Sequence, residues 1–90
     1  MIVETTTELT IYEVEKLQHI FLKELNRKGT FILDMTLIEK IDIVGIQLLI
    51  ALVNSAKKLH KKIEFINITQ TALHQIKLCH CEDALGIVYE

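Results

Sequence analysis

Apolar residues recur with a helical period in two long segments of this chain. In residues 14–28 they are spaced by three and four positions, which predicts an amphipathic helix with one buried stripe: Val14, Leu17, Phe21 and Leu25. In residues 42–60 a broader apolar face predicts a second helix: Leu48, Leu49, Leu52, Val53, Ala56 and Leu59. Asp42 suits the N-cap of this second helix, because its carboxylate can accept the backbone N–H of Gly45.

Short apolar runs between and after these helices predict strands. Residues 30–34 are continuously apolar from Phe31 to Leu33, a pattern typical of a strand covered on both faces. Residues 63–68 predict the next strand, and Thr69 or Thr71 then caps a third helix that ends near Cys79. This alternation of strands and helices predicts an α/β sheet with right-handed crossovers.

The two ends of the chain carry weaker β patterns. Residues 2–5 and 9–12 predict either a hairpin or one irregular edge strand. Residues 87–89 predict a final short strand.

Composition narrows the class of protein further. Ninety residues predict a single domain, 1–90, and a net charge of −2 gives no general attraction to nucleic acid. The longest apolar stretch, residues 43–53, is interrupted by Gln47 and falls short of the roughly 20 residues that span a membrane. No basic segment follows Met1, so no secretory signal is expected. We therefore expect a cytoplasmic domain with no nucleic-acid partner and no membrane insertion.

The order of several motifs resembles the STAS domain, the fold of bacterial anti-sigma-factor antagonists. Residues 34–36 (Asp-Met-Thr) are similar to the family's Asp-x-Ser/Thr after the central strand, and residues 41–45 (Ile-Asp-Ile-Val-Gly) to its apolar-Asp-Ser-Ser/Thr-Gly signature. A leucine-rich helix, a strand at 63–68 and a capped helix follow, so the resemblance covers residues 9–85. It implies a small mixed sheet of about four strands with helices packed mainly on one face, and a docking surface centred on Asp42.

Position 43 departs from the pattern of the family. In the antagonists the residue after the aspartate is a serine that a partner kinase phosphorylates, and in the STAS subunits of bacterial lipid-transport ATPases it tends to be threonine. Here it is Ile43, and the only serine, Ser55, lies deep in the second predicted helix. The resemblance therefore predicts docking without the usual phosphorylation switch. Thr36, which matches a secondary regulatory position, is the best remaining phospho-acceptor.

A helical projection of the second helix predicts an apolar cluster on its polar face. Ile43 and Ile50 fall among polar residues, with Ile46 at the margin. Either a neighbouring loop or the chain's own tail covers this cluster, or a partner does. The predicted partner-binding residues are Asp34, Thr36, Asp42, Ile43, Val44, Gly45, Ile46, Gln47 and Ile50.

Other candidate chemistry is weaker. The run Cys79-His80-Cys81 has no zinc-knuckle spacing and no second Cys/His pair, so no metal site is predicted. The lysines of residues 57–62 complement the negative end of the helix dipole. Asp34 and Asp42 have no nucleophile nearby in sequence and no phosphate-binding loop, so loop hydrogen bonding and N-capping are their expected roles. No catalytic residue and no cofactor is predicted.

These observations predict a non-catalytic protein-interaction module. The expected partner is an anti-sigma-factor kinase-like protein, and the alternative is the ATPase subunit of a lipid-transport ABC complex. Homodimerisation through the cluster at Ile43, Ile46 and Ile50 is also possible on this pattern. A different kind of function is the binding or enzymatic conversion of a small ligand at the edge of the sheet. A pocket lined by convergent polar groups would favour that hypothesis.

Overall fold

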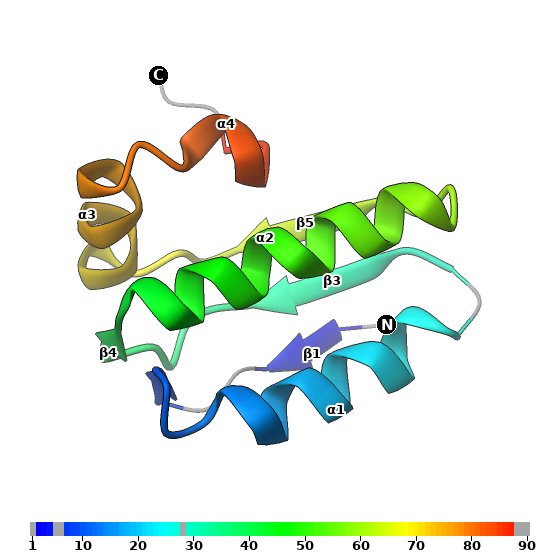
Figure 1. Ribbon diagram of the computed structural model, residues 1–90, viewed down its shortest axis with the longest axis horizontal. Helices are drawn as coiled ribbons and strands as arrows, with labels where there is room; N and C mark the ends of the chain where they lie inside the picture. The colour runs from blue at the N-terminus through cyan, green and yellow to red at the C-terminus, as the bar shows by residue number, and fades with distance from the viewer. Residues whose placement is uncertain (1, 5–6, 28, 88–90) are drawn as a thin grey trace.

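A computed structural model describes residues 2–4, 7–27 and 29–87. Its centre is a parallel sheet of three strands in the order β1 (Ile2–Glu4), β3 (Phe31–Asp34) and β5 (Ile63–Ile66), shown in Figure 1. In the β3–β5 pair, Phe31 lies opposite Ile63 and Leu33 opposite Phe65. β3 is therefore the central strand of this sheet.

Two helices, α1 (Val14–Leu25) and α2 (Ile43–Lys58), lie side by side against one face of this sheet (Figure 1). Phe21 of α1 meets Phe31 of β3 edge to face, with ring centroids 6.2 Å apart. On β3 the buried and half-buried residues alternate, so Ile32 points to the face that these helices do not cover. The expectation that β3 is covered on both faces is therefore wrong for the part of the chain that the structure describes.

A second parallel sheet consists of only two short strands, β2 (Glu8–Leu9) and β4 (Lys40–Ile41). Leu9 lies opposite Ile41, and this pairing places β2 beside the start of α2. The predicted N-terminal hairpin or single edge strand is wrong, because β1 and β2 belong to different sheets and residues 10–13 form a turn. β4 was not predicted, because a strand of two residues leaves no periodic signal.

The C-terminal third contains two further helices. α3 (Gln70–Leu78) begins at Thr69, whose Oγ1 accepts the N–H of Ala72 at 3.2 Å, as predicted. The short helix α4 (Glu82–Leu85) was not predicted and ends at Gly86, whose φ of 70° suits glycine. Ile87 has no regular structure, and the rest of the strand predicted at 87–89 lies outside the described residues.

The predicted α/β class, with helices mainly on one side of a small sheet, is confirmed. The described strands form two small parallel sheets instead of one mixed sheet of about four strands. One continuous cluster of buried side chains joins both sheets, and it includes Leu9, Leu33, Leu49 and Ile76. Among the described residues, no helix is long and apolar enough to cross a membrane.

Candidate partner-binding surface

Asp42 joins the start of α2 to a segment far away in the sequence. One carboxylate oxygen accepts the N–H of Gly45 at 2.9 Å, which is the predicted N-cap. The other oxygen accepts the N–H of Ile11 at 3.0 Å, and the backbone N–H of Asp42 donates to the carbonyl of Leu9. The aspartate therefore fixes the turn after β2 against the first turn of α2.

Gly45 makes this close approach possible. A Cβ atom at position 45 would lie 2.0 Å from the carbonyl oxygen of Leu9, a distance that no side chain tolerates. Leu9 itself is fully buried, and its backbone cannot move away without disturbing the core. The glycine of the motif is thus required by packing between β2 and α2.

Three residues with exposed apolar side chains lie in the two segments that Asp42 joins. Ile43 is 51% exposed, Ile11 is 60% exposed and Tyr12 is 87% exposed. The hydrogen bond from Ile11 to Asp42 brings the two segments together. We call Ile11, Tyr12 and Ile43 the helix-start patch.

Ile46 does not belong to this surface, contrary to the expectation from the helical projection. Its side chain is fully buried, and Ile50 is half-buried against the core. The projection was anchored partly on Leu59, which lies beyond the last residue of α2 and is 48% exposed. Of the three isoleucines predicted to be exposed, only Ile43 is on the surface.

Other residues of the predicted surface differ in accessibility. Gln47 is exposed, Val44 is half-buried, and Gly45 is buried and contributes only through the backbone. Ile11 and Tyr12 were missed, because the sequence pattern assigned them to a strand. The signal that could have found them is an apolar pair next to Glu13, just before the predicted helix that begins at Val14.

Asp34 is the centre of a separate hydrogen-bond network in the loop after β3. Its Oδ1 accepts hydrogen bonds from the side chain of Thr36, from the backbone N–H of Thr36 at 3.0 Å and from Asn67 at 3.3 Å. These bonds, chiefly those from Thr36, hold the pKa of Asp34 below its usual range. The carboxylate thus stabilises the loop, as expected from the sequence.

Thr36 is exposed, but its hydroxyl donates to Asp34. A phosphoryl group on this oxygen would remove that hydrogen bond and place about −1.5 to −2 charges beside a carboxylate. Phosphorylation here would therefore loosen the loop. Whether a kinase modifies Thr36 stays a prediction, to be tested by intact-mass measurement after incubation with a kinase.

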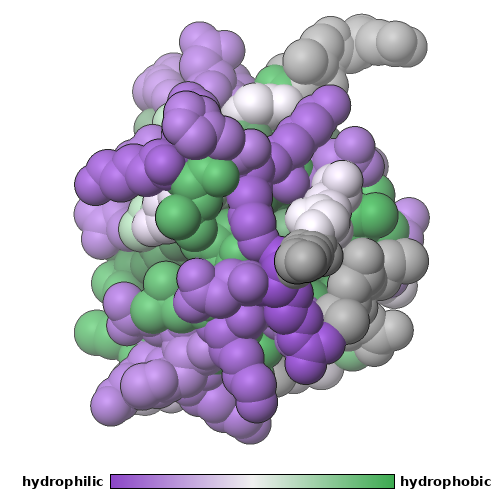
Figure 2. All heavy atoms as spheres, turned by 90° about the vertical axis from the view of Figure 1, so that its right-hand side faces the viewer, coloured by the Kyte–Doolittle hydropathy of each residue, from purple (hydrophilic) through white to green (hydrophobic). Residues whose placement is uncertain are grey.

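The lysines after α2 lie at the opposite end of the molecule from the helix-start patch. Figure 2 looks onto this end, where hydrophilic side chains surround apolar surface. Lys57, Lys58 and Lys62 are exposed, but Lys61 donates to the carbonyls of Leu25 and Arg27 at the end of α1. Lys61 thus caps the C-terminal end of α1, since its ammonium group satisfies carbonyls that have no hydrogen-bond partner within that helix.

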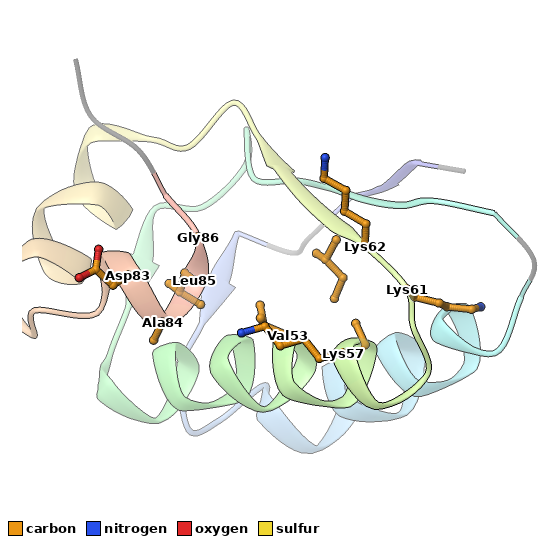
Figure 3. Close-up of a pocket in the computed structure, with 10 residues that line it drawn as sticks. Val53, Lys57, Lys61, Lys62, Asp83, Ala84, Leu85 and Gly86 are labelled. Atoms are coloured by element: carbon orange, nitrogen blue, oxygen red, sulfur yellow. The ribbon is translucent and has the colours of Figure 1, made fainter.

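A shallow cavity of about 290 Å³ lies between α2, β5 and α4 (Figure 3). Its walls include the apolar side chains of Val53, Ile63 and Leu85. Four charged residues also line it: Lys57, Lys61, Lys62 and Asp83. Figure 3 shows Lys61, Lys62 and Asp83 pointing away from the cavity, so the charged groups do not converge in it. The cavity therefore gives the small-ligand hypothesis no support.

The cysteines form neither a disulfide nor a metal cluster in the described part of the chain. Both are free thiols, and Cys81 Sγ donates to the carbonyl of Cys79 at 3.3 Å. Burial raises the pKa of the Cys81 thiol, which disfavours the thiolate that binds metals. No group of three His, Cys, Asp or Glu side chains among the described residues could hold a metal ion.

Comparison with known proteins agrees with this geometry. The family model described as "Mlab, STAS domain" matches residues 1–85, so the chain belongs to the STAS domain family. No protein with a curated description matches the sequence significantly.

Two solved structures share the fold. A sulfate transporter family protein from Wolinella succinogenes superposes with a TM-score of 0.79 at 19% identity, over 94% of this chain and 70% of that one. The murine anion transporter Slc26a9, in its inward-facing state, superposes with a TM-score of 0.80 at 23% identity, over 91% of this chain. This chain spans only 14% of the Slc26a9 chain, so the likeness is to one part of a much larger protein.

Proposed function

We propose that this STAS domain is a non-catalytic module that binds a protein partner through the helix-start patch. Within this proposal the domain acts in the cytoplasm and needs no cofactor. Its two loop carboxylates, Asp34 and Asp42, already accept hydrogen bonds from the protein itself, which supports a structural role for both.

The single observation that carries this proposal is the exposure of Ile43. Ile43 is half in solvent, and Asp42 links the start of α2 to the segment that carries the exposed Ile11 and Tyr12. Ile43 thus provides an apolar contact at the position where antagonists of the family carry the regulatory serine. Burying such side chains in a partner is favourable by about 1.5–3 kcal/mol for each large residue. With no hydroxyl at position 43, no kinase can add a phosphoryl group to this residue.

The two partner classes agree with this surface in different ways. The first is an anti-sigma-factor kinase-like protein, which the signature at residues 41–45 supports. The second is the ATPase subunit of a bacterial lipid-transport ABC complex, for which the domain would be a stable accessory subunit. Ile43 departs from both patterns, serine in the first class and threonine in the second, and provides the same apolar contact to a partner of either class.

Substitution of Ile43 by aspartate tests the proposal. The partner to be tested is a purified protein of either class whose gene lies near the gene for this chain. We expect Ile43→Asp to weaken binding to it at least about tenfold, because the aspartate charge must be desolvated in an apolar contact. Isothermal titration calorimetry measures the affinity. Binding to the kinase-like protein but not to the ATPase would identify the first partner class. Binding to the ATPase but not to the kinase-like protein would identify the second.

The matched control is Leu59→Asp, which makes the same change at an exposed leucine beyond the other end of α2. This variant should bind as the wild type does. Equal affinities for Ile43→Asp and wild type would remove the helix-start patch from the interface. Light scattering over a range of concentrations separates partner binding from homodimerisation through the same patch.

A further inference from the structure

The line along which α1 and α2 meet begins at the helix-start patch. The two helices lie side by side and run in the same direction, so their first turns lie at the same end of the molecule (Figure 1). Tyr12 lies just before α1, and Ile43 is the first residue of α2. The outer line between the helices therefore extends directly from the patch. We call this line the helix seam, and the residues at its surface are Gln18, Leu22, Ala51 and Ser55.

α2 presents no charge to solvent along most of its length. Residues 43–56 include no charged side chain, and the exposed residues among them are Ile43, Gln47, Ala51 and Asn54. The solvent face of a helix usually carries charged residues, whereas the core of a protein interface is depleted of them. The outer face of α2 therefore has the composition of an interface.

A shallow depression of about 50 Å³ lies in the helix seam. Buried side chains from both helices line it below the surface: Phe21, Leu48 and Leu52. Sites for small molecules usually have volumes of roughly 300–1,000 Å³. The depression therefore suits a single side chain of another protein and not a small ligand. Ala51 and Ser55 are small, so an approaching helix can come close to α2.

A partner segment that is buried in the helix seam must satisfy its own backbone. The backbone groups inside α1 and α2 already form hydrogen bonds within their helices, so the seam offers only side chains. An extended segment would lose hydrogen bonds to water there without replacing them, whereas a helix keeps its N–H and C=O groups paired internally. The seam therefore favours a helical partner over a strand.

We propose that the binding segment of the partner is an amphipathic helix that packs along α2 in the helix seam. This inference rests on the proposed function, because the helix-start patch forms one end of the same surface. The partner helix places an uncharged, apolar face on Leu22 and Ala51 and inserts one side chain into the depression. From Ile43 to Ser55 the surface extends about 18 Å, which corresponds to about twelve residues of partner helix.

Substitution of Ala51 by glutamate tests this surface. The probe is the same purified kinase-like protein or ATPase that is tested with Ile43→Asp. Its affinity, measured by isothermal titration calorimetry, should fall at least about tenfold for Ala51→Glu, because the carboxylate must be desolvated in an uncharged contact. Ala84→Glu makes the same change at an exposed alanine of α4 and should bind as the wild type does. Thermal unfolding should show that Ala51→Glu stays folded, since position 51 is exposed and glutamate favours a helix.

Together with Ile43→Asp, this variant separates failure of the inference from failure of the proposed function. Weaker binding of Ile43→Asp with unchanged binding of Ala51→Glu would leave the proposed function standing and overturn the partner helix. Unchanged binding of both variants would overturn both proposals. If neither protein binds the wild type, both proposals fail as well.

Photo-crosslinking distinguishes a helix from an extended segment. Benzoylphenylalanine replaces the exposed Gln47 in one variant and the exposed Asn54 in another, and mass spectrometry identifies the partner residues that each one captures. Gln47 and Asn54 are two helical turns apart, so the captured residues should lie roughly seven positions apart in one helix. A spacing of roughly three, which fits an extended strand, or capture of two separate segments would overturn the proposal. Capture of a second copy of this chain, together with a dimer in light scattering, would also overturn it.

Discussion

Two residues far apart in the sequence, Leu9 and Gly45, set how closely α2 approaches β2. The helix can begin where it does only because position 45 has no side chain. Asp42 then fixes the same junction with hydrogen bonds to both segments. At the residue scale, Asp42 and Gly45 of the family motif are explained by helix capping and close packing, and not by a catalytic role.

Substitution of Gly45 by alanine should therefore destabilise the protein. The added methyl group overlaps the carbonyl of Leu9, and such overpacking costs about 1–3 kcal/mol. Urea denaturation measures the change in the free energy of unfolding. Gln47→Ala, an exposed substitution two residues later in the same helix, is the control and should change stability by less than about 0.5 kcal/mol. Equal stabilities of Gly45→Ala and wild type would contradict the packing described for the junction.

Asp34 predicts how stability depends on pH. Because its pKa is lowered in the folded protein, the carboxylate contributes stability above its unfolded pKa of about 3.9, and this contribution is lost as the pH falls through the folded pKa. The wild type should exceed Asp34→Asn in stability at pH 6, and the difference should shrink towards pH 3. Urea midpoints at both pH values check this. A difference that is the same at both pH values would show that ionisation of Asp34 is not involved.

At the element scale, helices were predicted more accurately than short strands. The cap at Asp42 and the start of α2 follow from a local pattern, and so does the cap at Thr69. The pairing of β2 with β4 could not be predicted, because it joins two-residue segments distant in sequence. The same non-local pairing places β2 beside the start of α2, which a projection of one isolated helix cannot show.

The two side-chain caps should differ in their contribution to stability. Thr69→Ala removes one hydrogen bond to Ala72 and should cost about 1 kcal/mol. Asp42→Ala removes bonds to both Gly45 and Ile11 and should cost more, about 2 kcal/mol. Thermal and urea unfolding of both variants measure the order, and Asp42→Asn, which keeps an acceptor, should recover part of the loss. A larger cost for Thr69→Ala would contradict the bridging role of Asp42.

On the scale of the whole molecule, one small core supports both sheets. Leu49 is fully buried and belongs to the same cluster as Leu9 and Leu33. A domain of this length has little stability to spare, typically about 5–15 kcal/mol. We therefore expect the two sheets to unfold together.

Leu49→Ala tests this shared core. The variant should lose about 2–5 kcal/mol and should still unfold in one transition. Far-UV circular dichroism and the NMR signals of Leu9 and Phe65, one from each sheet, should give the same midpoint. Separate midpoints for the two signals would show that the two sheets are independent.

The hydrogen bond between Ile11 and Asp42 has a practical consequence for finding a partner. It joins residues 31 positions apart, so the helix-start patch is a discontinuous epitope. Arrays of overlapping linear peptides carry Ile11 and Ile43 on different spots and would not reproduce it. An antibody that binds the helix-start patch of the folded domain should compete with the partner, whereas one raised against either peptide alone should not.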